Sequence, residues 1–253
     1  MTAFLSALAF LTRLAPARLC APAAIGRCVS FFAPVGLVLG ALCTAAAWLA
    51  QAFMADLSAF EAAKPYNFAL AALLWLGLEM WLTRGLHWDG LADLADAAGA
   101  PGPLFWEILK DSRLGVFGTL SLLVAFCGQW AATAWHVAGR DWTGLILAPA
   151  WGRACAVWLA ASALPRNPQS LGGLVKAGAS FRTAAVLALI SLGMVIVLCA
   201  FGLPWLQGLA LPMVQYGLVR ALAKLAHEKG GFSGDFLGAA VILGQTWFLL
   251  ATL

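Results

Sequence analysis

The sequence predicts an all-α protein, a polytopic bundle of about seven transmembrane helices with a polar site on its cytoplasmic face. Of its 253 residues, 63% are hydrophobic and 10% are charged, whereas a soluble domain is about half apolar and a quarter charged. Apolar runs of about twenty residues, the length that crosses the hydrocarbon core as a helix, recur along the whole chain. The Lys and Arg side chains gather in alternate connecting segments, which is typical of polytopic membrane proteins.

The first element is the stretch from Thr2 to Leu14. It is too short for a span and has no basic residue ahead of it, so we expect it to lie at the membrane interface or to re-enter, rather than to act as a secretory signal. Seven longer runs follow, and each is expected to form a span: 30–54, 66–85, 114–138, 142–163, 182–203, 204–225 and 236–253. Only Gly202 and Pro204 separate the fifth run from the sixth, so these two are expected to form a tight hairpin.

The basic residues predict the orientation. With the N-terminus in the cytoplasm, all but three of the 15 Lys and Arg face the cytoplasm, the exceptions being Lys64, Arg140 and Arg153. The positive-inside rule favours this arrangement. The formal net charge of +4 is therefore a topology signal, and no nucleic acid is expected as a partner. Residues 1–253 are expected to form a single integral membrane domain, with cytoplasmic polar segments at about 85–113, 164–182 and 226–235.

Two ionisable residues fall within the predicted spans. Glu79 lies in the second and Arg153 in the fourth. A charged side chain is costly there and is by default paired or functional. We expect these two side chains to pair with each other or to snorkel toward the membrane surface. The alternative is that they line the entry for a substrate.

The cytoplasmic segments carry more carboxylates than topology requires. Asp89, Asp93 and Asp96 have a spacing of i, i+4 and i+7, which puts them on one helix face within an arc of about 60°. Three like charges repel unless a cation neutralises them, and oxygen ligands without His or Cys suit Mg²⁺. The alternative is that Asp89 caps the helix and the other two are solvated acids.

Two further polar segments lie on the same predicted face. The first runs from Glu107 to Gly118 and offers cations, a hydroxyl group and glycines that suit a phosphate cradle, although its basic residues also serve as ordinary membrane anchors. The second runs from Lys229 to Gly238 and is rich in glycine. It is either a flexible loop or the source of Ser233, Asp235 and backbone amides for a shared site.

The three segments together resemble the cobalamin synthase (adenosylcobinamide-GDP ribazoletransferase) family. The signature Gly-x-His-x-Asp-Gly-Leu-Ala-Asp-x-x-Asp of that family reads here from Gly85 to Asp96. Its (Lys/Arg)-Asp-Ser-Arg-x-Gly motif reads from Lys110 to Gly115, and its Gly-Gly-x-x-Gly-Asp-x-Leu-Gly-Ala motif from Gly230 to Ala239. Its N-terminal Phe-x-Thr-Arg-Leu appears from Phe10 to Leu14, so the resemblance extends over the whole chain.

The resemblance implies a transferase of the cytoplasmic (inner) membrane with its active site facing the cytoplasm. The implied reaction is a Mg²⁺-dependent transfer of the cobinamide phosphate group of adenosylcobinamide-GDP to α-ribazole or its 5′-phosphate, which releases GMP. The resemblance is compatible with a homo-oligomer and with a complex that includes other enzymes of the corrinoid pathway. The lipid bilayer is expected to surround the protein.

The matched motifs also suggest roles for individual residues. The metal ligands would be Asp89, Asp93 and Asp96. The substrate-binding residues would be Lys110, Ser112, Arg113, Ser233 and Asp235. The catalytic candidates are Asp89, Asp111 and His87. Asp111 and Asp235 are alternatives for the base or for a second metal position, while His87 is either a base or a residue that orients Asp89 or caps the helix.

The chain departs from the family pattern after Ala239, where the family usually carries acids and this sequence has Ile242 and Gln245. The alternative function classes are a secondary transporter and a non-catalytic membrane anchor of a biosynthetic complex. A transporter site belongs near the bilayer midplane, usually between inverted repeats, whereas these acids gather at one face and the Asp89 segment is not repeated. An anchor would not need three motif segments on one side of the membrane.

Overall fold

The computed structural model describes residues 2–16, 22–57 and 64–253. Arg18, one of the predicted cytoplasmic basic residues, lies outside these ranges. The described chain is helical, and its only β contact is an isolated bridge between Pro165 and Phe232, which confirms the all-α prediction. The helices are α1 Thr2–Leu11, α2 Pro22–Cys28, the 3-10 helix η2 Val29–Phe31, α3 Phe32–Leu57, α4 Lys64–Leu82, α5 Leu86–Ala97, α6 Gly102–Ile108, α7 Val116–Gly139, α8 Trp142–Ser162, α9 Leu171–Gly178, α10 Phe181–Ala200, α11 Trp205–Glu228 and α12 Gly234–Ala251.

Five of the described helical segments are long and apolar enough to cross a membrane. They are Ala24–Met54, which includes most of α3, and the helices α7, α8, α10 and α12. A sixth span results only if α4 and α5, which meet at an angle of 87°, are taken together. The sixth predicted span, 204–225, corresponds to α11, a long helix that carries Gln207 and Gln215 and is not among these candidates. The protein is therefore an integral membrane protein whose described part has five or six such helices, close to the predicted seven.

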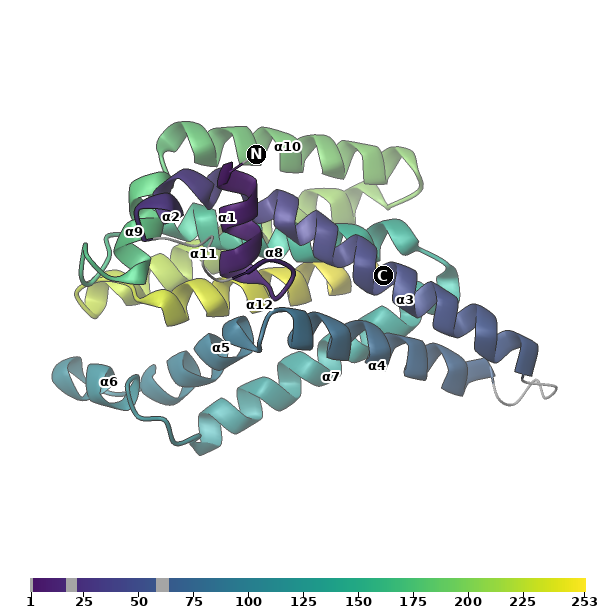
Figure 1. Cartoon of the computed structure of the whole chain (residues 1–253), viewed down its shortest axis with the longest axis horizontal. Helices are drawn as coiled ribbons and strands as arrows, with labels where there is room; N and C mark the ends of the chain where they lie inside the picture. The colour runs from purple at the N-terminus through teal and green to yellow at the C-terminus, as the bar shows by residue number, and fades with distance from the viewer. Residues whose placement is uncertain (1, 17–21, 58–63) are drawn as a thin grey trace.

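The long helices run back and forth along one axis, so that their connections lie alternately at the two ends (Figure 1). One end holds α5, α6, α9 and the loop between α11 and α12. At the other end, Asp141, Pro204 and Thr252 line one cavity. The hairpin between α10 and α11 is confirmed, because Gly202 has a φ of 113° and the Leu203 amide donates to the Leu198 carbonyl at 3.0 Å. The predicted cytoplasmic segments thus share one end of the bundle.

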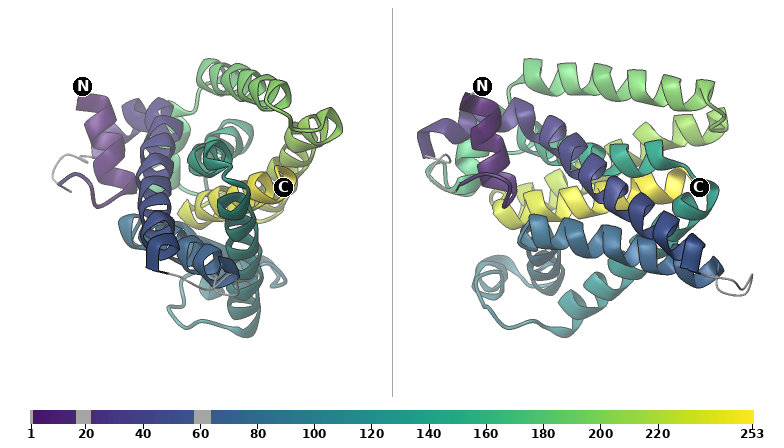
Figure 2. Two further views of the ribbon diagram at one scale, coloured as in Figure 1. Left: turned by 90° about the vertical axis from the view of Figure 1, so that its right-hand side faces the viewer. Right: turned by 45° about the vertical axis from the view of Figure 1, so that its right-hand side comes forward.

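Helix α8 forms the centre of the bundle, packed against α3 and α12, while α10 stands apart on the outside (Figure 2). Glycines permit the close approach of α3 and α8. A Cβ atom at Gly36 would lie 2.5 Å from the Pro149 carbonyl oxygen. In a membrane, where apolar surface gains nothing by leaving lipid, such backbone contact is a principal source of helix association.

A buried polar cluster crosses this centre and joins α4, α7, α8 and α12. Arg153 is fully buried and donates from Nη2 to Glu79 at 3.3 Å and from Nη1 to the Pro149 carbonyl at 2.9 Å, which confirms the predicted pair. Gln245 donates to Gln129 at 3.0 Å and to Glu79 at 3.5 Å. The carboxylate beside Gln245 of α12 is therefore supplied by Glu79 of α4.

Candidate active site

The site begins at the sharp turn between α4 and α5. Arg84 and Gly85 both have positive φ, 60° and 67°, a conformation that is uncommon for an arginine and must be held by its surroundings. Arg84 is held because its guanidinium donates to the carbonyls of Ala9 and Thr12 at the end of α1. In return, the Arg13 amide donates to the Leu82 carbonyl at 2.8 Å. The Phe10–Leu14 motif therefore fixes the turn that directs α5 across the end of the bundle.

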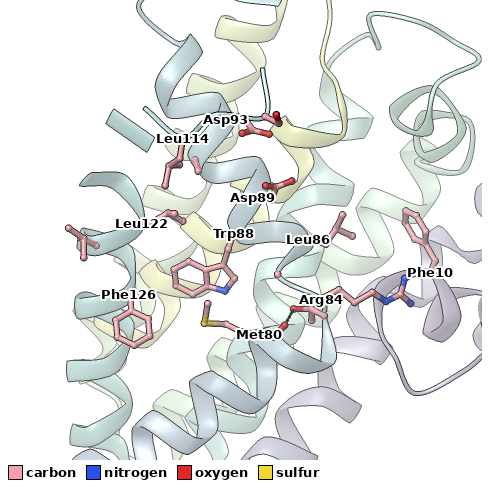
Figure 3. A pocket seen from close by; sticks show the side chains of 15 residues that line it. Phe10, Met80, Arg84, Leu86, Trp88, Asp89, Asp93, Leu114, Leu122 and Phe126 are labelled. Carbon is pink, nitrogen blue, oxygen red and sulfur yellow. Dashed lines mark hydrogen bonds between the residues drawn. The ribbon is translucent and has the colours of Figure 1, made fainter. Parts of the chain in front are cut away.

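Two of the predicted aspartates line a pocket of about 700 Å³ on α5. Asp89 and Asp93 lie on successive turns of the helix, with the aromatic rings of Trp88 and Phe126 beside them (Figure 3). Ser112, from the second motif, lines the same pocket. The pocket therefore combines carboxylates at one side with a large apolar wall, which suits a ligand with an anionic part and a bulky apolar part.

The electrostatics of this pocket favour a cation. Burial, and after it the negative charges of neighbouring carboxylates led by Asp89, raise the pKa of Asp93 to about 6. Asp235 and Asp96 contribute to the same repulsion. The raised pKa of Asp93 therefore indicates a concentration of negative charge around this carboxyl group.

Asp96 has a different set of partners. Its carboxylate accepts hydrogen bonds from the amides of Gly115 at 2.7 Å and Gly118 at 2.8 Å, so it stabilises the first turn of α7, where helix amides lack internal partners. A Cβ atom at either glycine would collide with the carboxylate. The third aspartate of the predicted metal set thus joins the second motif to α5.

Replacing Gly118 by alanine is expected to destabilise the protein by about 1–3 kcal/mol, because the new methyl group displaces the Asp96 carboxylate and leaves its amide partners unpaired. Thermal unfolding in detergent, followed by far-UV circular dichroism, measures the effect. Gly128→Ala in the same helix is the matched control, since a Cβ atom there meets only the Thr246 methyl at 3.8 Å. Equal unfolding temperatures for both variants would contradict the capping role.

The third motif reaches the site because α5 and α12 cross at glycines. A Cβ atom at Gly90 would lie 2.8 Å from the Asp235 carbonyl oxygen, and one at Gly238 would lie 3.2 Å from the His87 Cα. Asp235 therefore starts α12 directly against α5, and Ser233 Oγ donates to its carboxylate at 2.8 Å. The prediction that residues near the end of the chain join the Asp89 segment is supported by this geometry.

The charged residues of the second motif point elsewhere. Arg113 is exposed and donates to Asp111 from one guanidinium edge, through Nε and Nη2, with Nη2–Oδ2 at 2.6 Å, and this partner holds the pKa of Asp111 at about 2. Lys110 is also exposed, and none of these three side chains lines the pocket beside Ser112. Of the four predicted residues in this motif, only Ser112 is brought to the aspartates.

His87 faces a second, smaller cavity on the other side of Asp89. Its imidazole is 5% exposed, and its Nε2 atom has no hydrogen-bond partner. Burial, and then the charge of Arg153, hold the pKa of His87 well below its usual range, so the ring is neutral. The cavity measures about 140 Å³ and is also lined by Arg153, Asp89 and Asp235. The sequence indicated Arg153 only through its charge within an apolar run.

The donor set suits a magnesium ion shared with a ligand. Within residues 2–16, 22–57 and 64–253, no three His, Cys, Asp or Glu side chains converge to hold a metal by themselves. Mg²⁺ is commonly held by one or two carboxylates together with substrate phosphates and water. Asp89 and Asp93 line one pocket together, which fits that pattern. His87 lines the other cavity and is not a member of this donor set.

Comparison with known proteins identifies the family of this chain. The family model described as cobalamin-5-phosphate synthase matches residues 3–253. The chain is 40% identical over 250 residues to the adenosylcobinamide-GDP ribazoletransferase of Nitratidesulfovibrio vulgaris (strain DP4), covering 98% of this chain and 95% of that protein. It is 33% identical over 260 residues to the enzyme of the same name from Klebsiella pneumoniae (strain 342), covering 99% and 98%. No solved structure matches the chain. The chain belongs to the cobalamin-5-phosphate synthase family.

Proposed function

We propose that this protein transfers the cobinamide phosphate group of adenosylcobinamide-GDP to a ribose hydroxyl group of α-ribazole, or of its 5′-phosphate, with release of GMP. The observation that carries the proposal is the pocket of about 700 Å³ that holds Asp89, Asp93 and Ser112 beside an apolar wall. The named relatives act as adenosylcobinamide-GDP ribazoletransferases. Their substrate pairs a charged pyrophosphate with a large corrinoid, which matches a pocket of this composition.

In the proposed reaction, the acceptor hydroxyl oxygen forms a bond to the cobinamide phosphorus, and the bond from that phosphorus to the GMP oxygen breaks. Phosphoryl transfer depends mainly on positioning and charge neutralisation. Asp89 and Asp93 would hold Mg²⁺, which neutralises the pyrophosphate and the leaving GMP. Ser112 would donate a hydrogen bond to a phosphate oxygen. Asp235, oriented by Ser233, would accept the hydroxyl proton.

The test is reconstitution of the purified protein in lipid vesicles with adenosylcobinamide-GDP, α-ribazole and Mg²⁺. Release of GMP together with the complete corrinoid is the expected result. Each substrate omitted singly is the control, because hydrolysis of the donor alone would release GMP without transfer. A protein that is folded but yields no product under these conditions would exclude the proposed function.

The Mg²⁺ dependence of turnover is expected to change with pH. The raised pKa of Asp93, about 6, means that this carboxyl group is ionised above pH 7 and mostly protonated at pH 5. Protons compete with metal for a carboxylate, so the half-saturating Mg²⁺ concentration should be about tenfold higher at pH 5 than at pH 7.5. Magnesium titrations of GMP release at the two pH values measure this ratio. If this ratio of Mg²⁺ concentrations is near one, or if Asp93→Asn shows the same ratio as the wild type, Asp93 is excluded as a ligand of the ion.

We also propose that the protein lies in the cytoplasmic membrane with this pocket facing the cytoplasm. The positive-inside pattern supports this orientation. Gly99 comes shortly after the last residue of α5 and Gly139 is the last residue of α7. These two helices end near opposite ends of the bundle (Figure 1), and a Cβ atom at either glycine meets nothing within 4 Å. In a background without native cysteines, Gly99→Cys should react with an impermeant maleimide only in inverted vesicles, and Gly139→Cys only in intact cells. The reverse labelling pattern would invert the topology.

A further inference from the structure

The cavity of about 140 Å³ beside Asp89 is lined mainly by apolar side chains, and two of its polar lining residues carry an unpaired atom. The Nε atom of Arg153 and the Nε2 atom of His87 both lack hydrogen-bond partners, although the two side chains are 0% and 5% exposed. An unpaired buried polar atom costs about 1–3 kcal/mol. Such atoms are usually paired with water or with a ligand.

The two unpaired atoms determine which chemical group could form hydrogen bonds with both of them. The guanidinium Nε–H of Arg153 can only donate, while the Nε2 atom of a neutral imidazole accepts in one tautomer and donates in the other. A hydroxyl group can pair with both atoms, because it accepts from the guanidinium and either donates to the ring nitrogen or accepts from it. A phosphate is a poorer match, because Glu79 already compensates the charge of Arg153 and because Asp89 and Asp235 also line the cavity.

The position of the cavity relates it to the proposed reaction. Phe10, Leu86 and Asp89 line both this cavity and the larger pocket, so the two spaces meet at Asp89. With the donor pyrophosphate in the larger pocket, a group in the small cavity would approach phosphorus from the other side of Asp89. An attacking and a leaving oxygen must lie roughly in line across the phosphorus.

We propose that the small cavity is the acceptor subsite, which binds one ribose hydroxyl group of the acceptor nucleoside between Arg153 and His87. A volume of 140 Å³ admits part of a ribose but not its aromatic base, which stays outside. The vicinal hydroxyl group is then presented to Asp89 and Asp235. This assignment rests on the proposed function, and it makes Arg153 and His87 determinants of acceptor binding rather than of donor binding.

A cycle of protein and ligand variants tests the subsite. Equilibrium binding of α-ribazole and of its monodeoxy ribose analogues is measured for the wild type, His87→Leu and Arg153→Lys. The wild type should bind one analogue about 5- to 10-fold more weakly, the effect of one lost hydrogen bond. In His87→Leu that difference should fall below about twofold. His227→Leu, at an exposed position outside both cavities, should keep the wild-type ratio.

A second variant covers the case in which His87→Leu does not fold. Ala156 lines the small cavity, and Ala156→Leu should raise KM for α-ribazole about tenfold or more while KM for adenosylcobinamide-GDP stays within about twofold. The subsite is excluded if GMP forms normally but the wild type does not discriminate among the analogues. It is also excluded if the discrimination persists in His87→Leu or if both KM values rise together. If the wild type releases no GMP, the proposed function fails instead.

Discussion

Asp89→Asn is expected to lower turnover about a thousandfold while leaving the protein folded. Asp89 lines both the large pocket and the small cavity, on the exposed side of α5. Asparagine keeps the shape of the side chain but removes the charge that holds the metal, and a metal contributes several kcal/mol of charge stabilisation in phosphoryl transfer. The rate of GMP release in vesicles, with saturating substrates and Mg²⁺, measures the loss.

Glu107→Gln is the matched control, since it also converts an acid to its amide in the same polar segment but lies outside both cavities. It should retain normal turnover. Size-exclusion profiles of both variants in detergent establish that they are folded. Turnover of Asp89→Asn within a factor of ten of the wild type would exclude Asp89 as a ligand of the catalytic ion.

Glu79→Leu is expected to destabilise the protein by about 3–5 kcal/mol, because it leaves the fully buried guanidinium of Arg153 without its counter-charge. Removing both charges is much less harmful than removing one. The double variant Glu79→Leu/Arg153→Leu should therefore recover most of the lost stability. Thermal unfolding in detergent compares the wild type, the single variant and the double variant.

The double variant also separates stability from function. If Arg153 serves only to pair Glu79, the refolded double variant should bind α-ribazole as the wild type does. If Arg153 binds the acceptor, the double variant should be stable but weak in acceptor binding. A single variant as stable as the wild type would mean that Arg153 does not depend on Glu79.

The Glu79–Arg153 pair lies beside a neutral side chain of α12. Gln245 Nε2 lies 3.5 Å from Glu79 Oε2 and donates to Gln129 at 3.0 Å. The counter-charge of the buried guanidinium therefore comes from α4, while α12 contributes an amide to the same cluster.

Sequence alone predicted the fold class, the approximate spans and a site shared by the three polar segments, and it offered the pairing of Glu79 with Arg153 as one alternative. The fold class and the spans depend on hydrophobic length and charge distribution, which are read directly from the chain, and the shared site was inferred from linear motifs. The α10–α11 hairpin was predictable because Gly202 and Pro204 interrupt the long apolar run at one point.

Only the tertiary structure decided which side chains of a motif face the site. The spacing of Asp96 puts it on the same face as Asp89. The start of α7 packs against Asp96, however, and the amides of Gly115 and Gly118 donate to its carboxylate. Lys110 and Arg113 are adjacent to Ser112 in sequence, yet they point into solvent. Which groups meet depends on where helices far apart in the chain cross, and those crossings are set by packing at residues such as Gly90 and Gly238. The small cavity between Arg153 and His87 follows from the same crossings.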